Sequence, residues 1–403
     1  MKILIVNAHW NNRGDEAALC ALIDALLENK DKLNTKTEIT VVFKETKGVS
    51  EWPYENRVRC EMTRYRPSEE KVKHVVEDQH SDDPDIQKEI ELVEWSDFVV
   101  YAPGGAVISD RFWWEKQLEY IFPLYYAQKI GKKTIFASPS VGPFDTEHGL
   151  RDQFFKDIDL LCLRESIGMD AVKNCVGICG NQIQSCDLAF VSDINNEKAS
   201  GQLSADLELS NFLKKYDRIV GLTVSDLSWN VGYLNKEDLM IQIEKTIKGF
   251  IAYLETKNMG VILIPQLFGE QDDESYLERY KTENCYLLSK RYNSNFQQYL
   301  IGRLYAVAGV RYHCNIFAAK MGTPMIPIVY EQKMQGFLQD SGMEDWGVDI
   351  SELSTNIMVT KMERLELEYT QKRSFLQEQF VNWKNKARNC IHEIESFIYI
   401  GEK

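Results

Sequence analysis

The sequence has no apolar run that approaches the roughly 18 residues of a membrane-spanning helix. Its first residues, from Met1 to His9, become polar too soon for a secretory signal peptide, and we expect them to form a buried strand instead. These two features predict a cytoplasmic protein.

Positive charge is also scarce. The chain has 47 Lys and Arg against 61 Asp and Glu, which gives a formal net charge of −14. Nucleic acids and anionic membrane surfaces attract basic proteins, so this balance excludes a general nucleic-acid binder. An anionic substrate would need a local cluster of cations that works against the overall field.

Signatures of common cofactors are missing as well. No Gly-x-Gly-x-x-Gly follows the first expected strand, so the dinucleotide fingerprint is absent. The nine cysteines form one loose group, Cys175, Cys179 and Cys186, without the second pair or the histidines of a zinc site. We expect reduced thiols, no metal and no cofactor.

The chain does have the length and the pattern of two α/β domains. At 403 residues it exceeds the usual size of a single core. Short apolar strands alternate with helical segments in both halves, which is typical of doubly wound parallel sheets. A polar stretch at 192–215 suggests the junction. We predict an N-terminal Rossmann-like domain (1–195), a C-terminal one (210–362) and a helical segment (363–403).

The most informative stretch lies between two strand-like runs, 304–308 and 325–330. Arg311 and His313 fall where the first strand ends, before a short helix expected from Ile316. Ligands of open α/β sheets bind at this edge, where a helix N-terminus favours anions. Arg311 offers a fork for carboxylate or phosphate, and His313 can transfer a proton near neutral pH.

Other strand ends carry polar residues or glycines. Lys333 follows the strand 325–330 and could reach the same crevice. Arg164 ends an apolar strand, where it could bind an anion or pair with Glu165. Gly104 and Gly105 could form a binding loop or only a turn that ends a strand.

The loop after the first strand contains Asn12 and Asp15, and a helix is expected to start near Asp15. Asp15 suits the N-cap of that helix, and it could also face a ligand. His9, at the end of the first strand, could face a cleft or simply close the strand.

These segments together resemble the polysaccharide pyruvyl transferase family. The blocks that carry the resemblance occur in the family's order, and each is short. They are Asn12 to Asp15, the turn at Gly104 and Gly105, Arg164 to Ser166, Asp187 to Phe190, and Arg311-x-His313 followed by Tyr330 and Lys333. One departure is Ala106, where the family usually has a third glycine.

The resemblance implies two Rossmann-like domains that face a cleft, as in glycosyltransferase-B folds. It implies transfer of an enolpyruvyl-derived group from phosphoenolpyruvate to two sugar hydroxyls, with a pyruvyl ketal and phosphate as products. His313 would be the acid, and Arg311, Arg164 and Lys333 would bind the donor. On the acceptor side would lie Asn12, Asp15, Gly104 and Gly105.

The acceptor implied is a polysaccharide or a lipid-linked oligosaccharide, which would bring the protein to the inner face of a membrane. The sequence leaves open whether the chain associates peripherally with that membrane or forms homo-oligomers. Two alternatives also stay open. One is a nucleotide-sugar-dependent glycosyltransferase of the same architecture, and the other is a non-catalytic glycan-binding relative.

Overall fold

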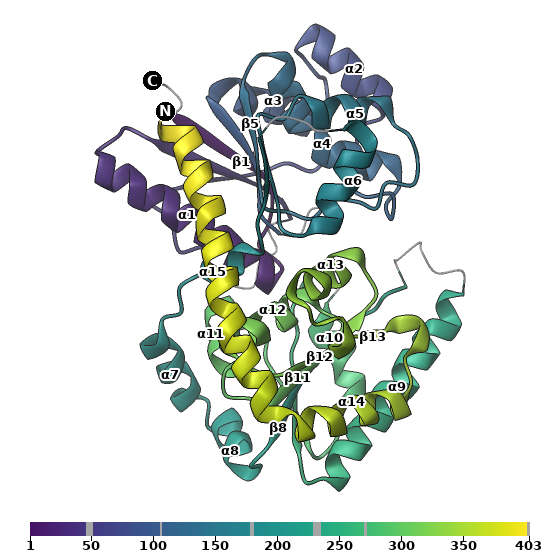
Figure 1. The fold of residues 1–403 in the computed structure, drawn as a ribbon. Coiled ribbons are helices and arrows are strands. Elements are labelled where there is room, and N and C mark those ends of the chain that lie inside the picture. Colours follow the sequence, from purple (N-terminus) through teal and green to yellow (C-terminus); the bar gives the residue numbers. More distant parts are fainter. Residues whose placement is uncertain (46–50, 105–106, 178–180, 229–234, 270–271, 401–403) are drawn as a thin grey trace. The chain divides into compact units, whose positions relative to one another are not determined.

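The chain forms two compact α/β units in the computed structural model (Figure 1). The structure describes residues 1–45, 51–104, 107–177, 181–228, 235–269 and 272–400. Unit 1 contains Met1–Asn11, Asp15–Val191 and the chain from Asn385 onward, and unit 2 contains Asn12–Gly14 and Ser192–Lys384. None of the described helices has the length and apolarity required to cross a lipid bilayer.

Unit 1 is built on a parallel sheet of seven strands in the order β3-β2-β1-β4-β5-β6-β7. Its strands are β1 (Lys2–His9), β2 (Glu38–Glu45), β3 (Arg59–Met62), β4 (Phe98–Tyr101), β5 (Lys133–Ala137), β6 (Leu160–Leu163) and β7 (Asn181–Gln184). The order reverses direction between β1 and β4, as in a doubly wound nucleotide-binding fold.

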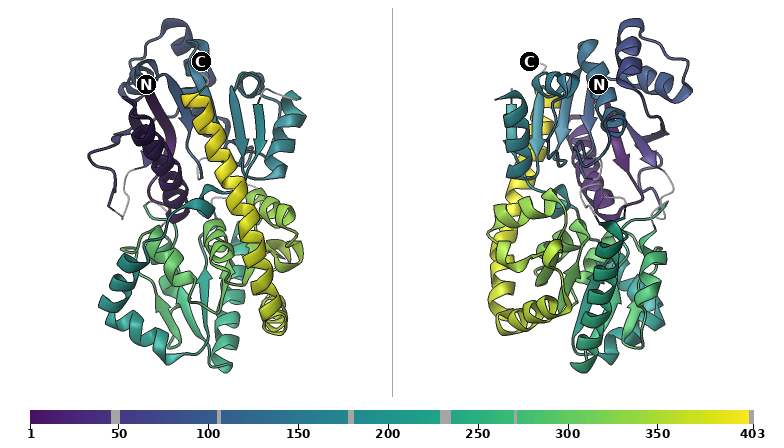
Figure 2. Two further views of the ribbon diagram at one scale, coloured as in Figure 1. Left: turned by 60° about the vertical axis from the view of Figure 1, so that its left-hand side comes forward. Right: turned by 90° about the vertical axis from the view of Figure 1, so that its right-hand side faces the viewer.

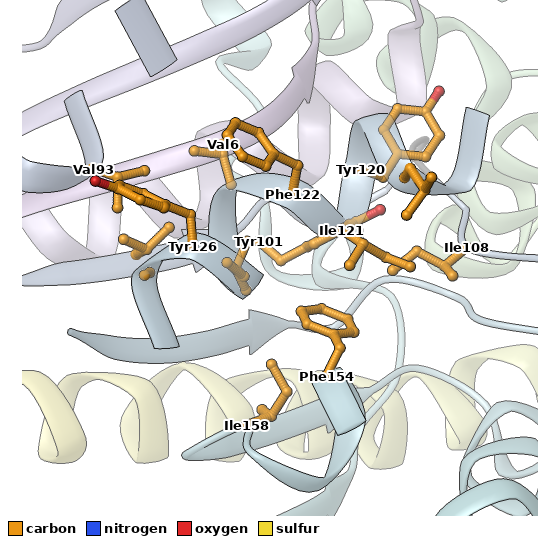
Figure 3. Close-up of a cluster of buried hydrophobic side chains, with 14 of the residues drawn as sticks. Val6, Val93, Tyr101, Ile108, Tyr120, Ile121, Phe122, Tyr126, Phe154 and Ile158 are labelled. Carbon is orange, nitrogen blue, oxygen red and sulfur yellow. The ribbon is translucent and has the colours of Figure 1, made fainter. Parts of the chain in front are cut away.

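Helices cover both faces of this sheet (Figures 1 and 2). They are α1 (Arg13–Leu33), α2 (Glu69–Asp78), α3 (Pro84–Trp95), α4 (Trp114–Lys129), α5 (Gly149–Lys156) and α6 (Ser166–Val176), with a 3₁₀ turn, η1 (Leu188–Val191). Side chains of α4 pack on the sheet together with Val6, Tyr101 and Phe154 (Figure 3). This apolar layer fixes the strand ends that carry the polar residues.

Unit 2 repeats the same topology with six parallel strands in the order β10-β9-β8-β11-β12-β13. The strands are β8 (Ile219–Thr223), β9 (Gly260–Leu263), β10 (Cys285–Leu287), β11 (Ala306–Gly309), β12 (Met325–Val329) and β13 (Val348–Asp349). The order reverses between β8 and β11. The predicted pair of doubly wound α/β domains is confirmed.

The helices of unit 2 follow its strands in the usual alternation. They are α7 (Asn196–Ala205), α8 (Leu207–Lys215), α9 (Lys236–Thr256), α10 (Asp273–Leu277), α11 (Ser294–Ile301), α12 (Tyr312–Met321), α13 (Gln332–Ser341) and α14 (Thr355–Leu367), with the 3₁₀ turns η2 (Glu278–Tyr280), η3 (Glu344–Trp346) and η4 (Ile350–Glu352). The last helix, α15 (Tyr369–Tyr399), is drawn in yellow in Figure 2. Its first half belongs to unit 2 and its second half to unit 1.

Three short strands were not expected from the sequence. They are β3, β7 and β13, and none of them coincides with a continuous apolar run. The residues of β3 are mostly exposed, so they lack the apolar pattern that signals a strand. Backbone pairing with β2, from Thr40 with Arg59 to Phe43 with Met62, holds β3 at the edge of the sheet.

Candidate active site

Arg311 and His313 lie where β11 gives way to α12, at the strand-order reversal of unit 2. Gly309 ends β11, Arg311 occupies the N-cap position, and His313 is in the first turn of α12. The predicted strand end is therefore confirmed, but the helix starts at Tyr312 rather than near Ile316. Asn315 supports the early start, because its Nδ2 donates to the carbonyl oxygens of Gly309 (3.2 Å) and Arg311 (3.0 Å).

The guanidinium of Arg311 is held by a carboxylate that sequence reasoning did not single out. Nε donates to Oδ2 of Asp273 (2.9 Å) and Nη2 donates to Oδ1 (2.5 Å), so the pair is bidentate. Oδ2 of Asp273 also accepts from the backbone N–H groups of Gln266 (3.0 Å) and Leu267 (2.9 Å). The loop after β9 thereby fixes the plane of the guanidinium.

The Arg311–Asp273 pair is almost completely buried, with side-chain exposures of 10% and 3%. Burial alone would lower the pKa of Arg311, but the charge of Asp273 outweighs it and raises that pKa. Asp273 occupies the edge of the guanidinium that is formed by Nε and Nη2. Within the described residues, no group accepts a hydrogen bond from Nη1 of Arg311. The second edge of the fork can therefore bind an anionic ligand.

His313 is buried against the backbone of Gly14, which belongs to the same unit. A Cβ atom added to Gly14 would lie 1.7 Å from Cγ of His313 and 1.9 Å from its Nδ1. No side chain fits there. A glycine at position 14 therefore allows the backbone there to pack directly on the imidazole and to limit its rotation.

The segment around Gly14 is anchored to unit 2 by its neighbours. Asn12 forms a bridge with Leu267, and the backbone N–H of Arg13 donates to the carbonyl of Gln266 (3.0 Å). The buried Arg13 side chain donates to the carbonyl of Lys290 (2.6 Å) and lies over the ring of Phe268. These contacts hold Gly14 in place against His313.

The expectation that Asp15 is the N-cap of the first helix is wrong. Helix α1 begins at Arg13, because the side chain of Asn12 accepts from the backbone N–H of Gly14 (2.9 Å) and caps the chain earlier. Asp15 lies in the first turn, within unit 1, where a carboxylate complements the helix dipole. A Cβ added to Gly104 would lie 2.5 Å from Oδ1 of Asp15. Gly105 lies outside the described residues.

Lys333 follows β12 in the first turn of α13, in unit 2. Its Nζ forms an ion pair with Oε2 of Glu331 (2.6 Å), and both side chains are partly exposed. Strands β11 and β12 pair side by side, and the charge of Glu331 adds to that of Asp273 in raising the pKa of Arg311. Arg311, Lys333 and the acids Asp273 and Glu331 thus form a local group with balanced formal charge.

Arg164 lies in unit 1, in an internal polar group. Its Nε donates to Oγ of Ser140 (2.6 Å), and its Nη1 donates to Oδ2 of Asp187 (2.6 Å). Glu165 lies 3.6 Å away, and all the charged side chains are buried. These contacts explain an arginine at this position without a ligand. Arg164 belongs to unit 1 and Arg311 to unit 2.

The surroundings of His9 disfavour a positive charge on its imidazole. Burial, followed by the charges of Lys116 and Lys44, lowers the pKa of His9 to about 3. His9 therefore stays neutral near pH 7 and is a poor proton donor. This favours His313 over His9 as the candidate acid.

Comparison with known families matches residues 12–332 to the family model described as polysaccharide pyruvyl transferase. The match covers well over half of the 403 residues and includes Arg311 and His313, and it ends one residue before Lys333. The chain belongs to this family.

A curated relative of this pyruvyl transferase family member is the amylovoran biosynthesis protein AmsJ of Erwinia amylovora. The two are 22% identical over 251 residues, which is 58% of this chain and 58% of AmsJ. The matched part therefore spans less than two thirds of that relative.

Solved structures with similar folds are remote in sequence. The UDP-GlcNAc 2-epimerase of Neisseria meningitidis has a TM-score of 0.59 at 9% identity, with 98% of this chain and 99% of that chain covered. The α,α-trehalose 6-phosphate synthase of Burkholderia multivorans has a TM-score of 0.55 at 9% identity, with 98% of each chain covered. These similarities show the glycosyltransferase-B type of fold and nothing about the substrate.

Two residues of the candidate site were missed by sequence reasoning. Asp273 stands in an acidic run with Asp272 and Glu274, where no pattern distinguishes one carboxylate from the others. Arg13 precedes Gly14 in a recognised block, but nothing in the sequence showed that its side chain would be buried in unit 2. Both roles depend on contacts between distant segments.

Replacement of Gly14 by alanine should damage the site. The new Cβ would overlap His313, so we expect a loss of about 1–3 kcal/mol in the free energy of unfolding, seen as a fall of several degrees in Tm. Gly201→Ala is the matched control, because a Cβ there meets nothing within 4 Å and the residue lies inside α7. Equal Tm values for the two variants would show that the close packing on His313 does not exist.

Proposed function

We propose that the protein transfers the pyruvyl group of phosphoenolpyruvate to two hydroxyls of one sugar in a polysaccharide or its lipid-linked precursor. The observation that carries this proposal is the placement of His313 in the first turn of α12, two residues after a guanidinium with an unused edge. Family membership supports the same reaction.

The donor would bind at the start of α12. Phosphoenolpyruvate has a carboxylate and a phosphate, and each is a suitable partner for the free edge of Arg311. The first N–H groups of a helix lack intrahelical acceptors and favour an anion. Lys333 could contribute a further cation if it turned away from Glu331. The formal charge of Arg311 is offset by Asp273, so directed N–H groups, rather than net charge, would supply most of the specificity.

His313 would then donate a proton to C3 of the donor. As C3 becomes a methyl group, C2 acquires oxocarbenium character and bonds to the oxygen of the first sugar hydroxyl, which loses its proton to a base. The second hydroxyl replaces phosphate at C2 and closes the ketal. The two hydroxyl protons balance the proton gained at C3 and the proton carried away on phosphate. A well-placed acid typically contributes 10²–10⁴-fold to such a step.

Asp15, beside Gly104 in unit 1, is our candidate for the base, and Asn12 and the turn at Gly104 and Gly105 are candidates for acceptor contacts. Arg164 stays a candidate for donor binding, although its internal contacts explain it without a ligand. An Asp15→Asn variant with full transfer activity would exclude the base role.

The donor can be tested by thermal stability in the presence of millimolar phosphoenolpyruvate. At about 100 times its dissociation constant, a ligand adds roughly 2.7 kcal/mol, which corresponds to several degrees in Tm. We expect this shift in the wild type and not in Arg311→Lys, which keeps a positive charge beside Asp273 but lacks the second edge of the fork. A wild type stabilised by UDP and not by phosphoenolpyruvate would instead support a nucleotide-sugar glycosyltransferase.

A further inference from the structure

An exposed aromatic side chain stands beside an unpaired arginine in unit 1. Trp113, which precedes α4, is 52% exposed, and the guanidinium of Arg66 lies 5.2 Å from the centre of its ring. Arg66 is exposed, and it has no ion-pair partner among the described residues. By contrast, Arg111 and Arg151 in adjoining segments pair with Asp145 and Asp110.

The loop that presents Trp113 is held rigidly. The side chain of Trp114 donates from Nε1 to Oε2 of Glu69 (2.9 Å), and its ring stacks on His148 at 3.9 Å with an interplanar angle of 3°. Before Trp113, Asp110 accepts from the buried Arg151 (2.6 Å). Hydrogen bonds from Thr146 and the charge of Arg151 outweigh the effect of burial and lower the pKa of Asp110 to about 2, so this anchor is ionised at neutral pH.

The segment that carries Arg66 is fixed at both ends. Thr63, Tyr65 and Pro67 are buried while Arg64 and Arg66 are exposed, so alternate side chains face the surface. The segment follows β3 and leads into α2, whose first residue is the Glu69 that binds Trp114. The two segments are thus joined next to the Arg66–Trp113 contact, which leaves little conformational entropy to lose on binding.

We propose that Trp113 and Arg66 form a binding surface for an acidic sugar of the glycan acceptor; this rests on the proposed function. The face of an indole ring packs on the C–H groups of a pyranose, and a guanidinium fork binds carboxylate or phosphate. Within the described residues Arg66 has no acidic partner, so its guanidinium is available to an anionic group. The negative charge could belong to an acidic sugar or to a sugar phosphate.

The test is saturation-transfer NMR with three probes and no phosphoenolpyruvate. The probes are neutral methyl β-D-glucopyranoside, methyl β-D-glucopyranosiduronate with a carboxylate, and α-D-glucose 1-phosphate. We expect Trp113→Ala to weaken all three, and Arg66→Gln to weaken only the two anionic probes, by about three- to tenfold. Arg111→Gln, in the adjoining loop, is the matched control and should leave all three unchanged.

The surface would be refuted if none of the probes bound the wild type, or if Arg66→Gln affected them no more than Arg111→Gln. Stronger binding of the phosphate probe would identify a phosphate-bearing acceptor, and stronger binding of the uronate an acidic sugar. The thermal shift with phosphoenolpyruvate is measured separately on the same variants. If the wild type bound these sugars through Trp113 and Arg66 but showed no such shift, the proposed glycan surface would be supported and the proposed donor would be excluded.

Discussion

The variant His313→Gln should lose transfer activity by about 10²–10⁴-fold while it still binds phosphoenolpyruvate. Glutamine has a similar length and can hydrogen-bond, but it cannot deliver a proton to C3 of the donor. The fork of Arg311 and the N-terminus of α12 stay in place, so the thermal shift with phosphoenolpyruvate should be retained. The measurements are phosphate release in the presence of a glycan acceptor and Tm with and without the donor.

His74→Gln is the matched control for this experiment, because His74 is an exposed histidine on α2 that pairs with Asp78. It should behave as wild type in both assays. If His313→Gln released phosphate at the wild-type rate, the acid would have to be another group. If the variant lost both activity and the donor-induced shift, His313 would act in binding rather than in proton transfer.

The fold could be predicted further than the site. The strands that the sequence predicts are those with continuous apolar runs, such as β1 and β12, because burial on both faces of a parallel sheet leaves a recognisable pattern. The strands β3, β7 and β13 are short elements at the sheet edges, and β3 and β7 contain no buried side chain, so backbone pairing holds them. Such strands leave almost no signal in the sequence.

For the candidate site, the sequence predicts where residues lie along the chain but not which distant side chains they contact. Arg311 and His313 were placed correctly because a strand–helix boundary is a local feature of the chain. The pairing of Arg311 with Asp273 and the packing of Gly14 on His313 join segments 38 or more residues apart, so neither could be read from spacing. Arg164 illustrates the same limit, since its buried partner Asp187 became visible only in three dimensions.

The second large effect is expected at Asp273. In Asp273→Asn the buried guanidinium of Arg311 would keep its charge and lose its counter-ion, which typically costs about 3–5 kcal/mol in the free energy of unfolding. Urea unfolding and Tm should both show this loss. The thermal shift with phosphoenolpyruvate should also shrink, because the fork of Arg311 would no longer be held in one plane.

Asp145→Asn provides the matched control for Asp273→Asn. Asp145 also pairs with an arginine, Arg111, at 2.9 Å, but the side chains are 59% and 44% exposed, so water replaces the lost partner. We expect its free energy of unfolding to change by no more than about 1 kcal/mol.

The double variant Asp273→Asn/Arg311→Gln should regain part of the stability lost in Asp273→Asn, because it removes the unpaired charge and leaves groups that can hydrogen-bond to each other. If the double variant were no more stable than Asp273→Asn, the cost would come from the lost hydrogen bonds to Gln266 and Leu267 instead. Asp273 would then mainly stabilise the loop after β9, and the orientation of Arg311 would have to depend on other contacts.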